Sequence, residues 1–286
     1  MPSTREIRRR IRSVKNTGQI TKAMEMVSAV KMRRAQEAVE ASRPYAERMA
    51  ELVGGLARMI ASADEVDPLL VQRPIARAGI IVVTSDRGLC GSLNTNVIRN
   101  AARFIVEVKV PVQAMAIGRK GRDWLVRHSG GITAEVSGLS ARPTLLEISP
   151  ITTLAINGYR EGRFDQVILT YTRFVSTARQ VAVRRQILPV VPPEGSATGL
   201  LDYIFEPSAE VVLANLLPRY VEIQVYQALL ESTASEHASR MLTMHNATQN
   251  AKEVVQELTL TLNKTRQAGI TREILEIVGG AEALKG

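Results

Sequence analysis

Residues Leu216–Thr265 read LLPRYVEIQVYQALLESTASEHASRMLTMHNATQNAKEVVQELTLTLNKT. Alternating steps of four and three from Leu216 fall on apolar or small side chains at most positions. These seam positions are Leu216, Tyr220, Ile223, Gln227, Leu230, Ala234, His237, Met241, Met244, Thr248, Ala251, Val255, Leu258, Leu262 and Thr265. A seam kept over seven heptads is typical of a coiled-coil helix. Such a helix spans about 75 Å, far more than the average globular helix of about 11 or 12 residues.

The seam is weaker in its middle part. Between Ala234 and Ala251 the seam weakens to small and polar residues, apart from Met241 and Met244, where a purely structural coiled coil prefers Leu or Ile. We therefore expect something other than a partner helix to face this stretch.

The N-terminal region supplies a second long helix. From Thr4 to about Ile60 the only proline is Pro44, which favours a kink. Apolar residues recur there at spacings of three and four, namely Ile7, Ile11, Val14, Ala23, Met24, Val27 and Val30. The simplest way for two such long helices to cover their apolar faces is to pack against each other. The sequence therefore predicts an antiparallel pair with the rest of the chain inserted between them.

The middle region changes period. Ala78–Thr84 and Val112–Ile117 are short apolar runs, each followed by a helical pattern, at about 93–107 and 120–127. Two successive strand–helix units indicate a small parallel sheet with helices on its faces.

The remainder of this region predicts a helix and a hairpin. Ser149 followed by Pro150 has the chemistry of an N-cap and first helical position, so we expect a helix from there to about Gly162. Residues 166–174 and 180–188 read as an antiparallel hairpin. Residues 64–74 contain breakers and read as a linker. The predicted domains are 1–63 (N-terminal coiled-coil helix), 75–200 (inserted α/β domain, Rossmann-like) and 208–286 (C-terminal coiled-coil helix), which gives a mixed α/β fold class.

Composition narrows the function classes. No apolar run approaches the roughly 18 residues that span a bilayer, and the Arg-rich start lacks the apolar core of a secretory signal. A single cysteine excludes an internal disulfide. Of the net charge of +9, residues 1–36 carry +8. This basic helix is either a solvated face or a surface for phosphates, acidic lipid, an acidic protein or nucleic acid.

Motifs that carry chemistry are scarce. Residues 85–94 (SDRGLCGSLN) lie between a predicted strand and a helix, the context of a phosphate-cradling loop. They lack the Gly-Lys-Ser/Thr ending and the Gly-x-Gly-x-x-Gly pattern, which favours a tight turn. Cys90 is better interpreted as an inert buried thiol than as a nucleophile. His237 and His245 are eight residues apart, whereas a metal pair on one helix needs four. We expect no cofactor, no metal and no catalytic residue.

Four blocks in order then carry a family resemblance. They are ITKAMEMV (20–27), SDRGLCG (85–91), SEHASRM (235–241) with NAT (246–248), and ITREILEIVGGAEA (270–283). Together they resemble the γ subunit of F-type ATP synthases, in bacteria. The resemblance implies a non-catalytic rotating central stalk whose coiled coil turns inside a head of α and β subunits and whose base rests on the c ring with the ε subunit. It places the chain at the cytoplasmic face of the cell membrane, peripherally.

The same resemblance implies residue roles. Head contacts are implied for Lys22, Met24, Lys31, Arg33, Arg34, Arg240, Arg266, Gln267 and Thr271, and c-ring contacts for Tyr203 and Glu206. The small and polar seam between Ala234 and Ala251 fits a shaft that turns against its surroundings. Gly269 should loosen the last turns. The alternatives are a coiled-coil nucleic-acid-binding protein that uses the basic helix, and a small α/β enzyme with helical arms.

Overall fold

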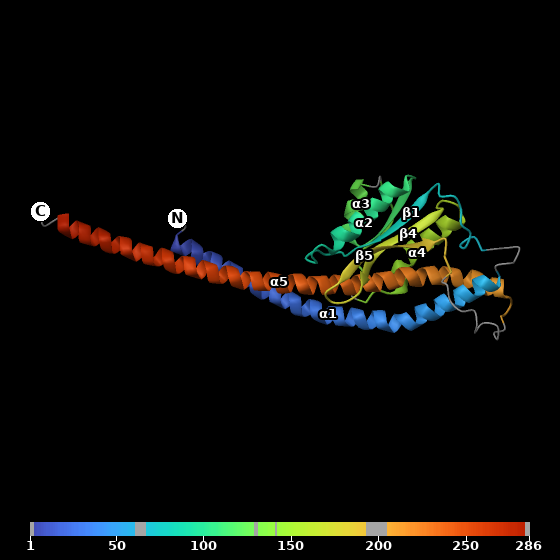
Figure 1. The fold of residues 1–286 in the computed structure, drawn as a ribbon, viewed down its shortest axis with the longest axis horizontal. Coiled ribbons are helices and arrows are strands. Elements are labelled where there is room, and N and C mark those ends of the chain that lie inside the picture. Colours follow the sequence, from blue (N-terminus) through green and yellow to red (C-terminus); the bar gives the residue numbers. More distant parts are fainter. Residues whose placement is uncertain (1–2, 61–66, 129–130, 141, 193–204, 284–286) are drawn as a thin grey trace. The chain divides into compact units, whose positions relative to one another are not determined.

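The computed structural model describes residues 3–60, 67–128, 131–140, 142–192 and 205–283. Its elements are α1 (Thr4–Met59), β1 (Ala78–Val83), α2 (Leu93–Val108), β2 (Val112–Ile117), α3 (Arg119–His128), β3 (Ile132–Val136), α4 (Leu145–Arg160), β4 (Gln166–Phe174), β5 (Gln180–Leu188) and α5 (Ala209–Ala283). The chain forms two compact units, one of residues 1–27 with 241–286 and one of residues 28–240. Both long helices, α1 and α5, run through the two units (Figure 1).

A five-stranded sheet organises the unit of residues 28–240. Its strand order is β3-β2-β1-β4-β5, with every pair parallel except β4 and β5. The predicted strand–helix units and the predicted hairpin are confirmed. β3 was not predicted, because its five residues alternate between half-buried and exposed and lack the apolar block that marks β1.

Helices cover both faces of this sheet. One face packs under α2 and α3, where Val97, Ala101, Phe104 and Leu125 are buried. The other face packs on α4 and α5, together with the part of α1 that belongs to this unit (Figure 1). Because β1 is covered on both faces, all six of its residues are buried, as expected for a central parallel strand.

The predicted start of α4 is wrong. The helix begins at Leu145 after the N-cap Thr144, and not at Ser149. Glu147 closes a capping box by accepting from the Thr144 backbone N–H at 2.6 Å, which satisfies a donor that the helix itself leaves free. Pro150 therefore lies inside the first turns rather than at the first helical position.

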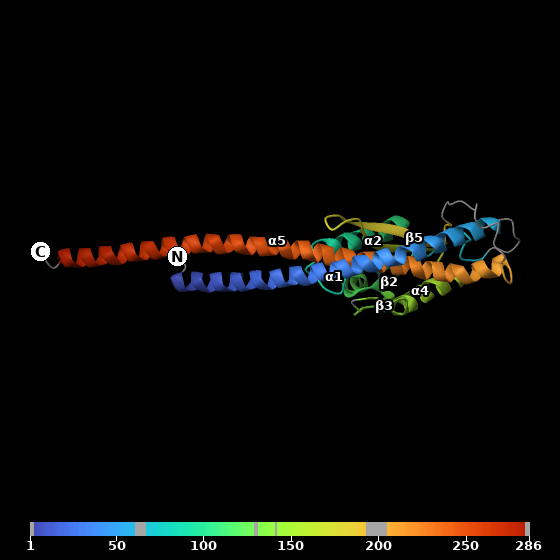
Figure 2. The ribbon, with the colours of Figure 1, turned by 90° about the horizontal axis from the view of Figure 1, so that it is seen from below.

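The two long helices pair antiparallel in each unit, as predicted (Figures 1 and 2). In the unit of the chain ends, the hydroxyls of Thr21 and Thr248 lie 2.8 Å apart. In the other unit, Gln227 Nε2 donates to Ser42 Oγ at 3.4 Å. Every predicted seam position of α5 from Leu216 to Thr265 is buried or half-buried, so the predicted seam is confirmed. The expectation that something other than a partner helix faces its middle part is wrong, because Ala234 packs with Ala35 and Val39 of α1 and Thr248 contacts Thr21.

The apolar face predicted for α1 is partly wrong. Val27 and Val30 are 56% and 54% exposed, and Ala23 is exposed as well. The face that meets α5 instead continues from Ile7 in steps of four and three, through small and polar residues. It runs through Ile11, Val14, Gly18, Thr21, Glu25, Ser28, Met32, Ala35, Val39, Ser42, Ala46, Met49, Val53 and Leu56, all buried or half-buried.

Candidate functional site

The turn between β1 and α2 contacts α5 through side-chain hydrogen bonds. Within the turn, Asn94 Oδ1 accepts from the Ser85 N–H at 3.0 Å, and Ser85 Oγ donates to the Arg87 carbonyl at 2.6 Å. Leu89 and Gly91 take positive φ angles of 62° and 57°. These contacts fold residues 85–92 into the tight strand-to-helix turn that the sequence favoured. The Gly88 and Cys90 carbonyls of this turn face α5.

Two side chains of α5 bind these two carbonyls. Ser239 Oγ donates to the Cys90 carbonyl at 2.6 Å. The Arg240 guanidinium donates to the Gly88 carbonyl through Nε at 3.3 Å and through Nη2 at 3.2 Å. Arg240 also pairs with Glu236 at 2.6 Å, one helical turn away. We call Glu236, Ser239 and Arg240 the α5 clamp.

Burial shapes the electrostatics of this clamp. Arg240 is only 8% exposed. Burial raises the pKa of Glu236, against the opposing effect of the Arg240 charge. For His237, burial together with the charges of Arg240 and Lys31 lowers the pKa to about 4. At neutral pH the cluster therefore holds one paired guanidinium beside a neutral imidazole, which suits a structural joint.

At the carboxyl ends of the parallel strands, the carboxylate of Asp86 occupies the place where a ligand could bind. Asp86 accepts from the Arg119 N–H at 2.9 Å and from the Gly138 N–H at 2.8 Å. Its carboxylate thus occupies the N-terminus of α3, the position where open α/β sheets commonly hold an anionic ligand. Gly118, at φ 95°, has no room for a Cβ against Thr84. The chain supplies its own anion at this edge of the sheet.

Cys90 is buried, as the sequence favoured. Its sulfur contacts the Asn94 amide at 3.3 Å, the Ser85 hydroxyl at 3.8 Å and the Arg87 carbonyl at 3.9 Å. None of these groups is a general base of the kind that activates a nucleophilic thiol. Within the described ranges, no three His, Cys, Asp or Glu side chains gather as metal ligands would.

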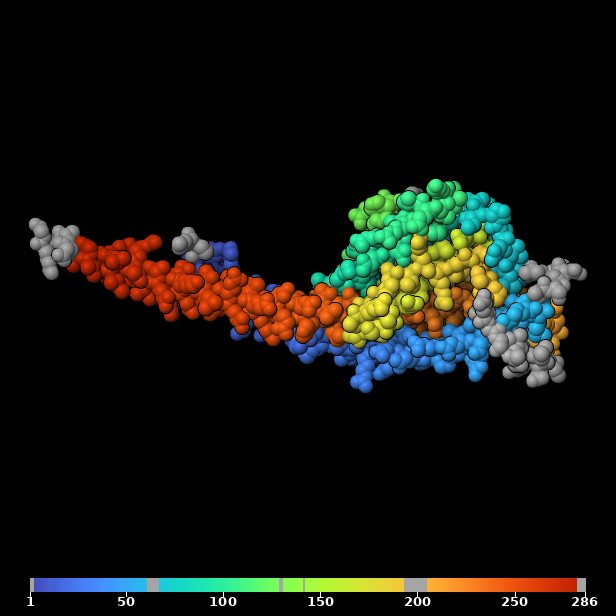
Figure 3. All heavy atoms as spheres, in the orientation of Figure 1, coloured from blue at the N-terminus to red at the C-terminus, as the bar shows by residue number. Residues whose placement is uncertain are grey.

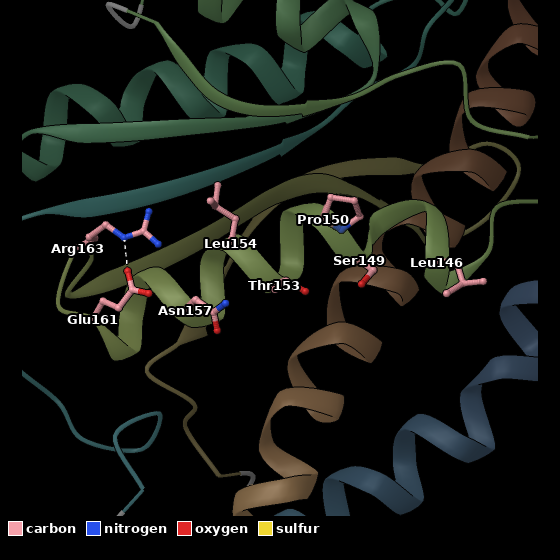
Figure 4. A pocket seen from close by; sticks show the side chains of 8 residues that line it. All are labelled: Leu146, Ser149, Pro150, Thr153, Leu154, Asn157, Glu161 and Arg163. Atoms are coloured by element: carbon pink, nitrogen blue, oxygen red, sulfur yellow. Dashed lines mark hydrogen bonds and ion pairs between the residues drawn. The ribbon is translucent and has the colours of Figure 1, made fainter.

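A hollow of about 510 Å³ lies along the outer face of α4 (Figure 4). Leu146 and Pro150 lie toward one end, and Glu161 is paired with Arg163 at 2.8 Å at the other. The lining offers neither a nucleophile with a base nor a set of convergent polar groups, so this hollow supplies no argument for catalysis.

The basic residues implied as partner contacts lie on the outside of α1. Lys22, Lys31, Arg33 and Arg34 are exposed, whereas Met24 is half-buried. Lys22 donates to Glu25 at 3.0 Å, and His245 of α5 contacts the same carboxylate oxygen at 3.2 Å. The Lys22 hydrogen bond is the main cause that lowers the pKa of Glu25.

Exposed apolar residues accompany these bases, and their exposure was not predicted from the sequence. Ile20, Met26, Val27 and Val30 are each more than half exposed. The signal was present in the sequence, because a seam drawn through Gly18, Thr21 and Glu25 leaves these four residues on other faces. Mixed basic and apolar exposure is typical of a surface that contacts other proteins.

The last part of α5 is exposed throughout. Thr248 and Thr21 set the register of the helix pair, and carrying that register on brings Thr265 level with Thr4, where α1 begins. Beyond it, residues 266–281 are all exposed (Figure 3). Of the implied contacts in this segment, Arg266 and Gln267 are free to meet a partner, while Thr271 bonds back to the Gln267 carbonyl at 3.0 Å. The segment also exposes Ile270, Ile274, Leu275, Ile277 and Val278.

Of the two residues implied as c-ring contacts, the structure describes only Glu206. Glu206 is exposed, just before α5. Tyr203 lies outside the described residues. Among those residues, no helix combines the length and apolar character needed to cross a bilayer.

Comparisons with known proteins give a single result. A family model described as ATP synthase matches residues 3–284. The chain is 53% identical to an ATP synthase gamma chain of Roseiflexus sp. (strain RS-1), over 99% of both chains. A solved central stalk and c-ring of the Tetrahymena thermophila mitochondrial ATP synthase is 27% identical, with a TM-score of 0.62, covering 80% of this chain and 99% of that one.

A second structure agrees in fold. It belongs to the Euglena gracilis mitochondrial ATP synthase, at 19% identity and a TM-score of 0.68, covering 98% of this chain and 94% of that one. Neither the family model nor these relatives points to nucleic acid. From the match over nearly its whole length, the chain belongs to the ATP synthase gamma chain family.

Proposed function

We propose that this chain is the non-catalytic rotating central stalk of an F-type ATP synthase. In this role it couples ion flow through the c ring to nucleotide turnover in a head of α and β subunits. The observation that carries the proposal is the uneven covering of α5. Up to Thr265 its seam is buried or half-buried, and from 266 to 281 every residue is exposed, including five large apolar side chains. A soluble protein keeps such a stretch for a partner.

Rotation changes affinity only through differential contacts. A shaft that presents different faces to successive β subunits favours a different nucleotide state in each, because a conformational equilibrium shifts only as far as the two states differ in contact energy. Two helices of unequal reach, with bases and exposed apolar residues on α1 and a bare apolar segment on α5, provide such asymmetry.

The head contacts divide into two sets. We assign Lys22, Lys31, Arg33 and Arg34, with Met24 beside them, to an acidic surface of the β subunits. Arg266, Gln267 and Thr271 would bind a loop of the head. Exposure of the four bases and of Arg266 supports this assignment. Each exposed charge pair would contribute only about 0–1 kcal/mol, so the contacts act together.

Arg240 differs from these exposed residues because it does not contact the head directly in this proposal. Its guanidinium is buried and bonded to Gly88 and Glu236 of its own chain. We infer that it influences the head indirectly, by fixing the turn of residues 85–92, on which Leu89 is 60% exposed.

Outside the head, the proposed partners of the chain are the c ring and the ε subunit. Glu206, and Tyr203 near it in sequence, would rest on the c ring at the cytoplasmic face of the membrane, with ε alongside. The division into segments 1–63, 75–200 and 208–286 remains our proposal for how the sequence distributes these roles.

One reconstitution tests the proposal. The chain is mixed with its cognate α and β subunits, the complex is isolated, and ATP-driven rotation of a probe on the chain is recorded. We expect a stable complex in which rotation accompanies hydrolysis, whereas the chain alone hydrolyses nothing. Failure to form such a complex would refute the proposal. Salt-dependent binding of DNA or RNA by the isolated chain would favour the basic-helix alternative instead.

A further inference from the structure

Strand β4 is longer than its partner β1. β1 pairs with β4 only from Gln166 to Thr170, whereas β5 pairs with β4 as far as Phe174. Alternate residues of a strand direct their backbone groups to the same edge, so Thr172 and Phe174 present theirs where β1 has ended. Thr172 is 3% exposed, and buried backbone groups need partners.

Helix α5 supplies those partners in place of a strand. Ser232 Oγ accepts from the Thr172 N–H at 3.2 Å. The Thr172 carbonyl accepts from Ser235 Oγ at 3.4 Å and from Ser232 Oγ at 3.5 Å. The Phe174 N–H lies near the Glu231 carboxylate and lowers its pKa, against the larger effect of burial. Figure 3 shows the atoms of the β4–β5 hairpin lying against those of α5.

Serine at positions 232 and 235 gives the strand hydrogen-bond partners, although serine does not favour a helix. Ser is a poorer helix former than Ala, because its hydroxyl competes for backbone groups. Ser232 and Ser235 are nevertheless buried, at 6% and 0% exposure, on a different face from Leu230 and Ala234, which pack with Ala35 and Val39 of α1. In this part of α5, one face serves the helix pair and another serves the sheet edge.

Hydrogen bonds add a mechanical property that the apolar core lacks. Apolar burial is non-directional, and it opposes separation of α5 from the sheet more than rolling of α5 about its own axis. Hydrogen bonds weaken steeply with angle. The bonds to Thr172 therefore oppose the rolling motion.

We propose that Ser232 and Ser235 are positioning residues that form the torque joint between the sheet and α5. The joint rests on the proposed rotor function. A twist applied to the sheet is passed through the edge of β4 into α5, which continues as one helix toward residues 266–283.

The first test uses the isolated chain. We compare the double variant Ser232→Ala/Ser235→Ala with Thr259→Ala, whose hydroxyl bonds only to the Val255 carbonyl of its own helix as far as α5 is described. Both variants favour the helix, so a loss cannot come from weakened helicity. We expect the Thr172 amide to exchange hydrogen about tenfold faster in the double variant, and at the wild-type rate in the control. Unchanged exchange at Thr172 overturns the proposal.

The second test uses the complex with cognate α and β subunits. A probe is attached at Val106→Cys on α2, a position 77% exposed, while the native Cys90 is buried. With the head fixed and turnover stopped, the thermal angular fluctuations of the probe report torsional stiffness. We expect the double variant to lose stiffness while its ATP hydrolysis stays at the level of the control.

The outcomes separate the two claims. Faster exchange at Thr172 with unchanged fluctuations overturns the torque joint, because the bonds would then be structural only. Failure of the wild-type chain to assemble or rotate overturns the proposed function itself. Wider fluctuations in the double variant alone, in a complex that assembles, support both.

Discussion

Two segments of one helix, α5, differ in almost every respect. Residues 229–240 are buried or half-buried on all sides, with Ala234 and Ala238 fully covered. Residues 266–281 are exposed on all sides. The first segment binds its own chain through the α5 clamp and the serine bonds to Thr172, and the second exposes apolar side chains without covering them. A continuous helix can thus serve its own fold in one part and a partner in another, and the two parts should respond differently to the same substitution.

The largest difference should come from removing an arginine. Arg240→Ala leaves Glu236 buried without its partner, which costs about 3–5 kcal/mol. The matched variant Arg272→Ala, in the exposed segment, should change stability by less than about 0.5 kcal/mol. Urea unfolding of the isolated chain measures both.

A double variant refines this prediction. Glu236→Gln combined with Arg240→Ala removes the buried charge as well, so it should be less destabilised than Arg240→Ala alone. Equal losses in the single and double variants would mean that Arg240 stabilises mainly through the Gly88 carbonyl.

The next largest effect is pH-dependent. His237 has its pKa lowered to about 4 by burial and by the charges of Arg240 and Lys31, against about 6.5 in an unfolded chain. The unfolded state therefore binds the proton more readily, and stability falls as pH decreases from about 6.5 to 4, by roughly 3 kcal/mol in total. His237→Gln should remove this slope.

Neighbouring acids require a difference measurement. Burial raises the pKa of Glu231 and Glu236, so their ionisation destabilises the folded protein as pH rises. This opposite trend partly masks the pH dependence that His237 causes. Subtracting the unfolding free energies of His237→Gln from those of the wild type at each pH isolates His237. A flat difference between pH 4 and 6.5 would contradict its lowered pKa.

A smaller effect should follow from overpacking. Ala234 is 0% exposed beside Ala35, Val39 and Leu230, so Ala234→Leu should cost about 1–3 kcal/mol. Ala268→Leu adds the same atoms in the exposed segment and should be nearly neutral. Equal thermal midpoints for the two variants would show that the close approach of α1 and α5 near Ala234 is not maintained in solution.

The sequence allowed much of the fold to be predicted, because periodicity dominates it. The α5 seam and strands β2, β4 and β5 follow from apolar spacing alone. β3 has no apolar block, and the start of α4 depends on the cap formed by Thr144 and Glu147, which the Ser149-Pro150 pair obscured. These features depend on local pairing that periodicity does not register.

The candidate site was less predictable, for a related reason. Small and polar seam positions suggested a neighbour other than a partner helix, yet Ala234 packs with Ala35 and Val39 of α1 and Thr248 contacts Thr21. The hydrogen bonds of α5 with β4 and with the turn after β1 are made by polar residues outside the seam. Ser232 and Ser235 bind the end of β4, and Arg240 binds the turn of residues 85–92. Both partners come from parts of the chain distant in sequence. Along α1, Gly18, Thr21 and Glu25 occupy the seam, and this placed Val27 and Val30 on the wrong face.

The smallest effect on stability should come from the largest deletion. Removing residues 266–286 takes away a segment whose described part, 266–281, is exposed throughout, so little buried area is lost. The isolated chain should keep its thermal midpoint, and its free energy of unfolding should change by less than about 1 kcal/mol.

In the complex with α and β subunits, the same deletion should weaken torque or coupling more than assembly, because it also removes Arg266, Gln267 and Thr271. Loss of assembly with normal torque in the remaining complexes would contradict this. A lowered thermal midpoint of the isolated chain would instead show that the exposed segment contributes to its own fold.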